Sequence, residues 1–366
     1  MQQELSRTEL AESAVAADPW QVASRPRVSV VIASKDRKDD LRRAIASCLR
    51  QSVAPEIIVL DDGSSDGTSE MVQREFPTVR LHRDETPQSV VVQRNRGARM
   101  AAGEFIVSID DDAEFPSPDT IAQTLAEFDH SKVGAVAIPF INVTQSPEVL
   151  QQAPDRPGKF LIANFWGTAY AVRRRLFLEL GGYRESLRQE MEEEDFCIRM
   201  LDAGYFICMG RADPIHHYFS PSRDNRWRNV RGSRNRVLFC WLNVPMPDLL
   251  VHVPGICANR LKHGLRSGYL AATLEGLGQG FLDWLRDGGA RRPVRQAACR
   301  LFRRLRRAPG MPLAAGLEML EPRPAPGFSG LPWATRASAF RAIVAAMIPI
   351  LAVTVATLST LLLVAR

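Results

Sequence analysis

The sequence changes abruptly from apolar to acidic at Val107-Ser108-Ile109-Asp110-Asp111-Asp112. Residues 105–109 predict a buried strand, because they form a short, mostly apolar run. Three carboxylates at the end of a buried strand repel one another unless a cation lies among them. Oxygen ligands suit hard divalent ions. The alternative is a solvated acidic turn, and the sequence upstream favours the cation site.

Upstream of this stretch the chain alternates short apolar runs with segments of helical periodicity. The expected strands are 28–32, 57–60, 79–81, 105–109 and 133–138. This alternation predicts an α/β fold with a mostly parallel sheet and helices on both of its faces. In such sheets ligands bind at the carboxyl ends of the strands. Ala33-Ser34, Asp61-Asp62 and Asp110 to Asp112 all fall at these ends.

The charge of the chain is uneven along its 366 residues. The net charge is +6, and a strongly basic run occupies 291–307. No aromatic-rich nucleic-acid motif accompanies this run, so it favours anionic membrane lipid rather than nucleic acid as a partner. The six cysteines form no CxxC pair and lie in apolar patterns, which predicts buried free thiols rather than disulfides or a zinc site.

The sequence predicts five regions along the chain. Residues 342–365 carry no charge over 24 positions, which is long enough to span a bilayer once, although a buried core helix is the alternative. Arg336 and Arg341 before this run predict that the folded part lies on the cytosolic face of the cell membrane. The expected regions are a flexible leader at 1–26, a globular domain at 27–245 with halves 27–138 and 139–245, a basic amphipathic helical region at 246–320, a linker at 321–341 and the spanning helix at 342–365.

Several segments, spread over residues 27–217, carry a family resemblance. They are 28–32, 59–68, Asn95 with 103–105, 109–112 and 194–200. Together they resemble family 2 of the inverting glycosyltransferases, which have the Rossmann-like GT-A fold. The resemblance implies metal-dependent transfer of a sugar from a nucleotide-diphosphate donor to a hydroxyl group. A membrane-bound enzyme of this kind suggests a lipid-linked or cell-envelope glycan as the acceptor.

The resemblance also assigns roles to the donor side of the site. Asp62 would contact the nucleotide base, and Asp112 would ligate Mg²⁺ or Mn²⁺, which stabilises the departing diphosphate. Asp110 and Asp111 would serve the ribose and a coordinated water. His217 would lie near the metal and the diphosphate. Ala33, at the end of the first strand, and Arg94 complete the expected donor contacts.

On the acceptor side, an inverting displacement needs a single base to take the acceptor proton. The matching residue is Asp195, with Glu194 orienting the acceptor and Trp166-Gly167 lining its site. Glu192 and Glu193 are expected to be surface charges. Without the resemblance, the run Glu192 to Asp195 reads as acidic residues that favour the first turn of a helix through its dipole.

Two other functions compete with this interpretation. A nucleotidyltransferase would share the sheet and the metal, but it would want a glycine-rich loop, which Ala33 to Arg37 does not supply. A membrane-anchored scaffold without activity is disfavoured by the presence of Asp62, Asp112 and Asp195. The run Gly276-Leu277-Gly278-Gln279-Gly280 resembles a dinucleotide motif, but no strand precedes it, so it predicts a small-residue packing face.

Overall fold

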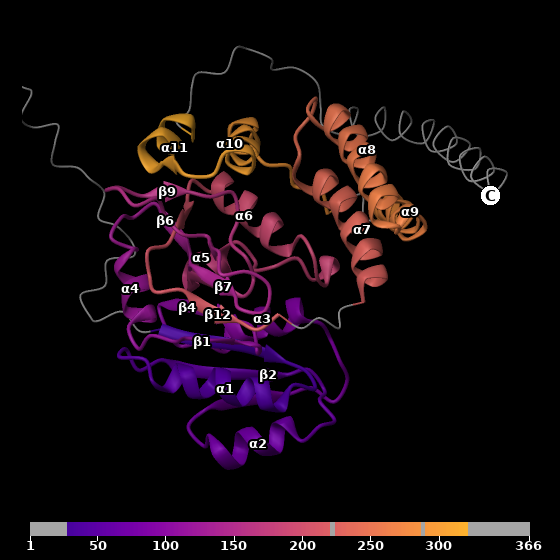
Figure 1. Ribbon diagram of the computed structural model, residues 1–366. Coiled ribbons are helices and arrows are strands. Elements are labelled where there is room, and N and C mark those ends of the chain that lie inside the picture. The colour runs from indigo at the N-terminus through magenta and orange to yellow at the C-terminus, as the bar shows by residue number, and fades with distance from the viewer. Residues whose placement is uncertain (1–27, 220–223, 287–289, 321–366) are drawn as a thin grey trace, which may run out of the picture. The chain divides into compact units, whose positions relative to one another are not determined.

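The computed structural model describes residues 28–219, 224–286 and 290–320, which all belong to one compact unit ending at Leu320. A nine-stranded sheet runs through this unit in the order β13-β9-β11-β6-β10-β4-β1-β2-β3 (Figure 1). The strands are β1 (Val28–Ser34), β2 (Glu56–Asp61), β3 (Arg80–Arg83), β4 (Phe105–Ile109), β6 (Val133–Ala137), β9 (Phe160–Leu161), β10 (Ala169–Arg173), β11 (Phe206–Met209) and β13 (Met311–Pro312). The five strands expected between residues 28 and 138 are confirmed, since they match β1, β2, β3, β4 and β6.

The sheet is mixed rather than mostly parallel. Strands β4, β1, β2 and β3 are parallel, as expected. Strand β10 then lies antiparallel to both β4 and β6. It comes from the part of the chain where the strand–helix alternation loosens, and a strand that enters without a crossover helix need not run parallel.

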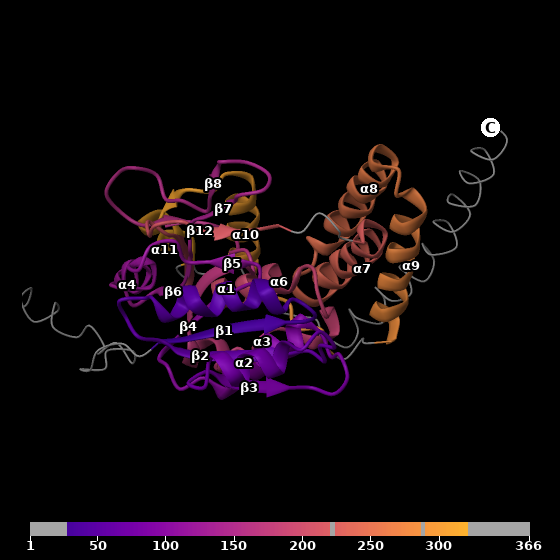
Figure 2. The ribbon, with the colours of Figure 1, turned by 60° about the horizontal axis from the view of Figure 1, so that its bottom comes forward.

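Some helices pack against the sheet, whereas three helices nearer the end of the described chain, α7, α8 and α9, pack on one another (Figures 1 and 2). The helices are α1 (Lys38–Leu49), α2 (Thr68–Glu75), α3 (Val90–Met100), α4 (Thr120–Ala126), α5 (Arg174–Glu179), α6 (Glu192–Asp202), α7 (Asn225–Asn243), α8 (Leu249–Ser267), α9 (Leu270–Arg286), α10 (Gln296–Arg307) and α11 (Leu313–Leu320). A second sheet, β5 (Ala113–Glu114), β12 (Ile215–His217), β7 (Phe140–Asn142) and β8 (Val149–Leu150), lies beyond the acidic end of β4.

Helix α3 packs closely on β1 because of Gly97. A β-carbon at Gly97 would lie 2.4 Å from Cγ1 of Val31, so any larger residue would push the helix off the strand. Both Val31 and Val91 are buried in this contact layer. The close approach fixes the height of α3 over the sheet, and it thereby sets the position of Arg94, which lies just before Gly97 on the same helix.

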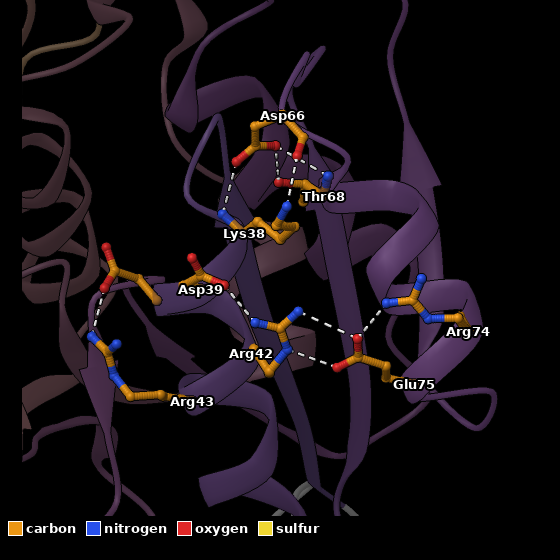
Figure 3. Close-up of polar contacts among 9 residues, drawn as sticks. Lys38, Asp39, Arg42, Arg43, Asp66, Thr68, Arg74 and Glu75 are labelled. Carbon is orange, nitrogen blue, oxygen red and sulfur yellow. Dashed lines mark hydrogen bonds and ion pairs between the residues drawn. The ribbon is translucent and has the colours of Figure 1, made fainter.

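Polar contacts join α1 to α2 and to the loop after β2 (Figure 3). Arg42 donates to Glu75 at 2.7 Å and so links the two helices. Asp66 accepts from the backbone nitrogens of Thr68, at 3.0 Å, and Lys38, at 2.9 Å. The loop after β2 and the start of α1 are therefore tied together at the edge where the site residues gather.

Helix α9 packs on α7 through its small residues. A β-carbon at Gly276 would lie 2.2 Å from the carbonyl oxygen of Val230, and one at Gly280 would lie 2.8 Å from that of Arg234. The expected small-residue packing face is confirmed. All six cysteines are free and buried, as expected from their spacing.

Among the described residues, no helix is long and apolar enough to cross a membrane. The predicted spanning helix at 342–365 lies outside the described residues, as do the leader at 1–26 and the linker at 321–341.

Candidate active site

The acidic end of β4 meets His217 through strand pairing. His217 pairs with Ala113 in the β12–β5 ladder, which places its ring beside the carboxylates that precede Ala113. Its Nε2 atom lies 3.2 Å from Oδ1 of Asp112 and 3.9 Å from Oδ2 of Asp110. The donor atoms of these three residues all lie within 4.8 Å of one another.

The hydrogen bonding of His217 suits a metal ligand. Its Nδ1 atom lies 2.7 Å from Oδ1 of Asn142, a carbonyl oxygen that can only accept. Nδ1 therefore donates to Asn142, and Nε2 faces the two carboxylates. Nε2 is buried and has no hydrogen-bond partner among the described residues. A divalent cation fits this set, since it would satisfy the unpaired nitrogen and both carboxylates.

Arg37 holds the opposite side of the same carboxylates. Its Nη1 atom donates to Oδ2 of Asp112 at 2.5 Å and lies 3.6 Å from Oδ1 of Asp111. Although burial opposes the effect, His217 and Arg37 hold the pKa of Asp112 below its usual value. This leaves Oδ1 of Asp112 to face His217. Sequence reasoning missed Arg37, because an arginine at the start of a helix carries no distinctive signal.

Asp111 turns away from His217 toward β1. It accepts a hydrogen bond from Oγ of Ser34 at 2.7 Å, and burial raises its pKa to about 7. Ala33 and Ser34 end β1, where Ser34 pairs with Asp61 of β2. The predicted donor residues at these strand ends are thus brought to one edge of the sheet.

Asp62 lies at the same edge, directly after β2. Its Oδ1 atom accepts from the backbone nitrogen of Gln88 at 2.8 Å and from Nε2 of Gln93 at 2.5 Å. Gln93 is fully buried and also donates to Asp84 at 2.6 Å. These contacts fix the orientation of the Asp62 side chain, and its role as a contact to the nucleotide base stays a prediction.

Arg94 bridges two acidic segments that are far apart in the sequence. Its Nη2 atom donates to Oδ1 of Asp110 at 2.7 Å and to the carbonyl oxygen of Gly167 at 3.1 Å. Its Nη1 atom lies 3.4 Å from Oε1 of Glu193 and 3.8 Å from Oε1 of Glu192. These contacts position the two acidic segments beside each other. The expected contact of Arg94 with the donor stays a prediction.

The structure contradicts the assignment of Asp195 as the base. Its side chain is fully buried, and Oδ1 accepts from Arg184 and, at 2.7 Å, from Asn243. Oδ2 accepts from Nε of Arg199 at 3.1 Å. Residues two positions apart on a helix point about 200° apart, so Asp195 faces the interior while Glu193 faces the Arg94 side. Asp195 is a buried ionic anchor for α6.

The expectation that Glu192 and Glu193 are surface charges is also wrong. Glu192 is 2% exposed, and the Glu193 side chain is 15% exposed. Burial raises the pKa of Glu193 well above its usual range, and the neighbouring Glu192 raises it further. Burial likewise raises the pKa of Glu192 to about 7. Glu194 is half-buried on the same turn, and its role toward the acceptor stays a prediction.

The backbone before α6 is held by Asn235 of α7. The Asn235 side-chain nitrogen donates to the carbonyl oxygens of Leu187, at 2.9 Å, and Glu190, at 2.7 Å. Met191, which directly precedes α6, has a φ of 76°, in the left-handed region that non-glycine residues rarely adopt. A strained residue held by neighbouring contacts is typical of functional sites. The sequence singled out Asn235 only within Arg234-Asn235-Arg236, as a candidate for phosphate contact, and did not predict this bracing of the backbone.

The predicted acceptor-side residues adjoin the site through Arg94 and Phe140. Gly167 offers its carbonyl oxygen to Arg94, and the Trp166 side chain is 52% exposed. The rings of Trp166 and Phe140 are 5.5 Å apart, and Phe140 lies 6.2 Å from the ring of His217. An exposed indole at this place provides a flat apolar surface near the group of Asp110, Asp112 and His217.

A second group of potential metal ligands lies away from this site. Asp248, His252 and Cys299 also bring their donor atoms within 4.8 Å of one another. Arg303 lies 4.0 Å from Asp248, and together with burial it lowers the pKa of His252. This group offers a single carboxylate, whereas the group of Asp110, Asp112 and His217 offers two.

Comparison with known proteins identifies the family. Residues 29–181 match the model described as glycosyl transferase family 2. The match covers 153 of the 366 residues, and these residues form a domain of this family. The expected family is therefore confirmed, and the domain is a glycosyltransferase domain. The match ends before α6, so the roles of Glu192 to Asp195 rest on geometry alone.

Three curated relatives match about half of the chain. An uncharacterized glycosyltransferase of Haemophilus influenzae is 28% identical over 51% of this chain and 66% of its own length. A glucosyl-dolichyl phosphate glucuronosyltransferase of Haloferax volcanii is 26% identical over 52% of this chain and 69% of its own length. An undecaprenyl-phosphate 4-deoxy-4-formamido-L-arabinose transferase of Salmonella paratyphi A is 30% identical over 56% of this chain and 64% of its own length.

Solved structures support the fold. A mannosyltransferase of Pyrobaculum calidifontis in complex with GDP-Man and Mn²⁺ has a TM-score of 0.51 and 19% identity, covering 82% of each chain. S. aureus TarS in complex with UDP-GlcNAc has a TM-score of 0.55 and 14% identity, covering 80% of this chain and 89% of its own. The expected GT-A-like α/β fold is thus confirmed, with a mixed sheet.

Proposed function

We propose that this protein transfers a sugar from a nucleotide-diphosphate donor to a hydroxyl group, with the help of a divalent cation. The observation that carries the proposal is the group formed by Asp110, Asp112 and His217, in which the buried Nε2 atom has no hydrogen-bond partner among the described residues. A neighbouring structure contains both a sugar nucleotide and Mn²⁺, which supports this reading. Asp112, His217 and Asp110 would hold the ion, which would stabilise charge on the diphosphate.

The chain's own residues divide the remaining work. Asp62 and Ala33 lie at the strand ends that would receive the nucleoside, and Asp111 adds a second carboxylate there. Trp166 offers an aromatic face to a sugar ring. Arg94 holds Asp110 and Glu193 at a fixed separation, so the donor and acceptor sides are positioned together.

We assign the general base to Glu193 in place of Asp195. The acceptor oxygen attacks the anomeric carbon while its proton passes to Glu193, and the bond from that carbon to the diphosphate breaks. The result is inversion of the anomeric configuration. A carboxylate with a raised pKa accepts a proton more readily near neutral pH than an ordinary carboxylate does. Asp195 is unsuited to this role, because three side chains from the protein already occupy it.

The acceptor is proposed to be lipid-linked or part of a cell-envelope glycan. One relative is named as a glucosyl-dolichyl phosphate glucuronosyltransferase and another as an undecaprenyl-phosphate 4-deoxy-4-formamido-L-arabinose transferase. Both names contain a polyprenyl phosphate. The charge-free run at 342–365 supports the same idea, since it would hold the enzyme at the cytosolic face of a membrane by one helix. Truncation after Pro332 tests the anchor: the shortened protein should leave the membrane fraction and still bind the donor.

The experiment that tests the activity is a donor panel. UDP-, GDP- and dTDP-sugars are incubated with the protein in Mg²⁺, Mn²⁺ or EDTA, and the nucleotide product is identified. Release of a nucleoside diphosphate in the presence of metal supports the proposal. Release of pyrophosphate would identify a nucleotidyltransferase instead. Donor binding without turnover of any donor would favour the scaffold, and full activity in EDTA would remove the metal from the mechanism.

A further inference from the structure

Helices α8 and α9 form a pair that packs on α7 (Figures 1 and 2). The outward faces of this pair are apolar. Nine large hydrophobic side chains are exposed in the described part of the chain, and five of them belong to this pair. The five are Leu250 (46%), Val251 (73%), Leu265 (59%), Leu282 (53%) and Leu285 (43%). We call these residues the α8–α9 face. Such a concentration is uncommon on the surface of a soluble monomer and marks an interaction site.

Helix α9 is apolar on two sides. One side, which includes Gly276 and Gly280, is buried against α7. Another side, which is outward, carries Ala271, Leu274, Gly278, Leu282 and Leu285, at spacings of three and four residues that place them in one stripe. A helix that is apolar on both sides is expected to have a partner on both. Within the described residues, α7 and α8 pack on α9, and the stripe with Leu282 and Leu285 stays exposed.

Helix α8 continues the pattern. Leu250, Pro254, Ala258 and Leu265 are exposed and follow the same three- and four-residue spacing. Only two residues separate α8 from α9, so the helices run antiparallel and their stripes lie next to each other. Helix α10 differs, because its apolar residues Leu301, Phe302 and Leu305 are buried. The expectation of basic amphipathic helices thus holds for α10, whereas α8 and α9 expose apolar residues.

Positive charges border the α8–α9 face. Lys262 and Arg266 follow the edge of the α8 stripe and are exposed, and Arg286 ends α9. Arg303 of α10 lies 4.0 Å from Asp248, which directly precedes α8 and therefore lies beside Leu250 and Val251. Exposed leucines rimmed by arginine and lysine match a surface of anionic phospholipid, which offers acyl chains below a layer of negative charge.

We propose that the α8–α9 face docks on an anionic phospholipid surface, with its leucines in the headgroup–acyl boundary and its cations on the phosphates. In this arrangement the helices lie along the membrane, with only the outward face in contact with lipid. The inference rests on surface composition and charge, and it holds independently of the reaction proposed above. Two other occupants, a second copy of the chain and residues 321–366 of the same chain, give different results in the test.

The test uses the full chain with one cysteine introduced on the face. All six native cysteines are buried, so an introduced exposed cysteine is labelled selectively. Val251→Cys and Leu282→Cys are each labelled with an environment-sensitive fluorophore, and Leu49→Cys on α1, which is 49% exposed, is the matched control. The proteins are mixed with vesicles of phosphatidylcholine, with or without phosphatidylglycerol. We expect a blue shift at 251 and 282 on phosphatidylglycerol vesicles, which salt reduces, and none at 49.

The outcomes separate the occupants. A label that stays in water on anionic vesicles overturns the proposal. A blue shift without vesicles also overturns it: independence from protein concentration would assign the face to the chain's own residues 321–366, and dependence on concentration to a second copy. An equal shift on phosphatidylcholine alone overturns the role of the cations.

A second variant tests the face even if another part of the chain, such as residues 342–365, already binds the membrane. The double variant Leu282→Gln with Leu285→Gln is read out by the label at 251. It should need about tenfold more lipid to reach half of the fluorescence shift. Thermal unfolding should be unchanged, because both leucines are exposed. Donor binding is measured on the same samples, so a failure of the proposed reaction is recorded separately. An unchanged shift at 251 in this variant would overturn the role of the α9 leucines.

Discussion

Nη1 of Arg94 lies 3.4 Å from Oε1 of Glu193, although 99 positions of sequence separate the two residues. The same guanidinium donates to Asp110 at 2.7 Å. One buried cation therefore joins the end of β4, which belongs to the proposed metal group, to the start of α6, which carries the proposed base. The geometry explains how two acidic segments can approach each other without a net repulsion.

Glu193→Gln should lower the turnover rate about a hundredfold to ten-thousandfold, the usual contribution of a general base. The donor should bind almost normally, because the base acts on the acceptor in the transition state. Steady-state kinetics and donor titration measure the two effects. Glu179→Gln, an exposed residue on α5, is the control and should retain most of the activity. Near-normal turnover in Glu193→Gln would place the base elsewhere.

Asp195→Asn should act on stability. The substitution leaves Arg184 and Arg199 without their buried carboxylate, and breaking a buried ion pair in this way costs about 3–5 kcal/mol. Denaturant unfolding measures this loss in free energy. The ion pair between Arg175 and Glu179 on α5 is exposed, so Glu179→Gln provides a control that should change stability by less than about 1 kcal/mol. An Asp195→Asn protein that is fully stable but inactive would restore Asp195 as the base.

The sequence was sufficient to predict the strand ends of the site. Parallel strands bring their carboxyl ends to one edge, so Ser34, Asp61 and Asp110 could be placed together from the strand pattern alone. The sequence was insufficient to predict which side of α6 faces the interior. Four consecutive carboxylates give no indication of which ones face inward, and this is set by Arg184 and Asn243, which lie in other segments.

The antiparallel entry of β10 and the role of Arg94 were unpredictable for a related reason. Both depend on pairings between distant parts of the chain, namely β10 with β4 and Arg94 with Glu193. Local periodicity gives the type of an element and its buried face. It carries no information on which distant element lies next to that face.

Asn142→Ala should weaken Mn²⁺ binding about 10- to 100-fold, although Asn142 is not expected to touch the ion. Its side-chain oxygen fixes the proton on Nδ1 of His217 and thereby keeps Nε2 available as a ligand. Electron paramagnetic resonance of free Mn²⁺ measures the affinity without any assay of activity. Asn229→Ala, on α7, is the matched control and should bind Mn²⁺ normally. Equal affinity in both variants would argue against His217 as a ligand.

The dependence of turnover on pH should reflect the pKa of Glu193, which lies beside Glu192. Burial and the neighbouring Glu192 raise the pKa of Glu193. A base works only when ionised, so turnover should fall as the pH falls through this raised pKa, well above the value of about 4.3 for an ordinary glutamate. Glu192→Gln removes a negative neighbour and should move the fall to lower pH. A fall at the same pH in this variant would show that another group controls the profile.

Gly167→Ala should impair transfer by displacing the Arg94 bridge. A β-carbon at this position would lie 2.4 Å from Oε1 of Glu193 and 2.6 Å from Nη1 of Arg94, closer than van der Waals contact allows. One of the two side chains must move, and a shift of about 1 Å in a catalytic group can reduce the rate about a hundredfold. Gly278→Ala is the matched control, because no atom lies within 4 Å of a β-carbon there, and an exposed helical glycine gains about 1 kcal/mol of stability from the change. Turnover and thermal unfolding, measured on both variants, separate the effect on the site from an effect on the fold. If Gly167→Ala were as active as Gly278→Ala, the contact between Arg94 and Glu193 would be dispensable for catalysis.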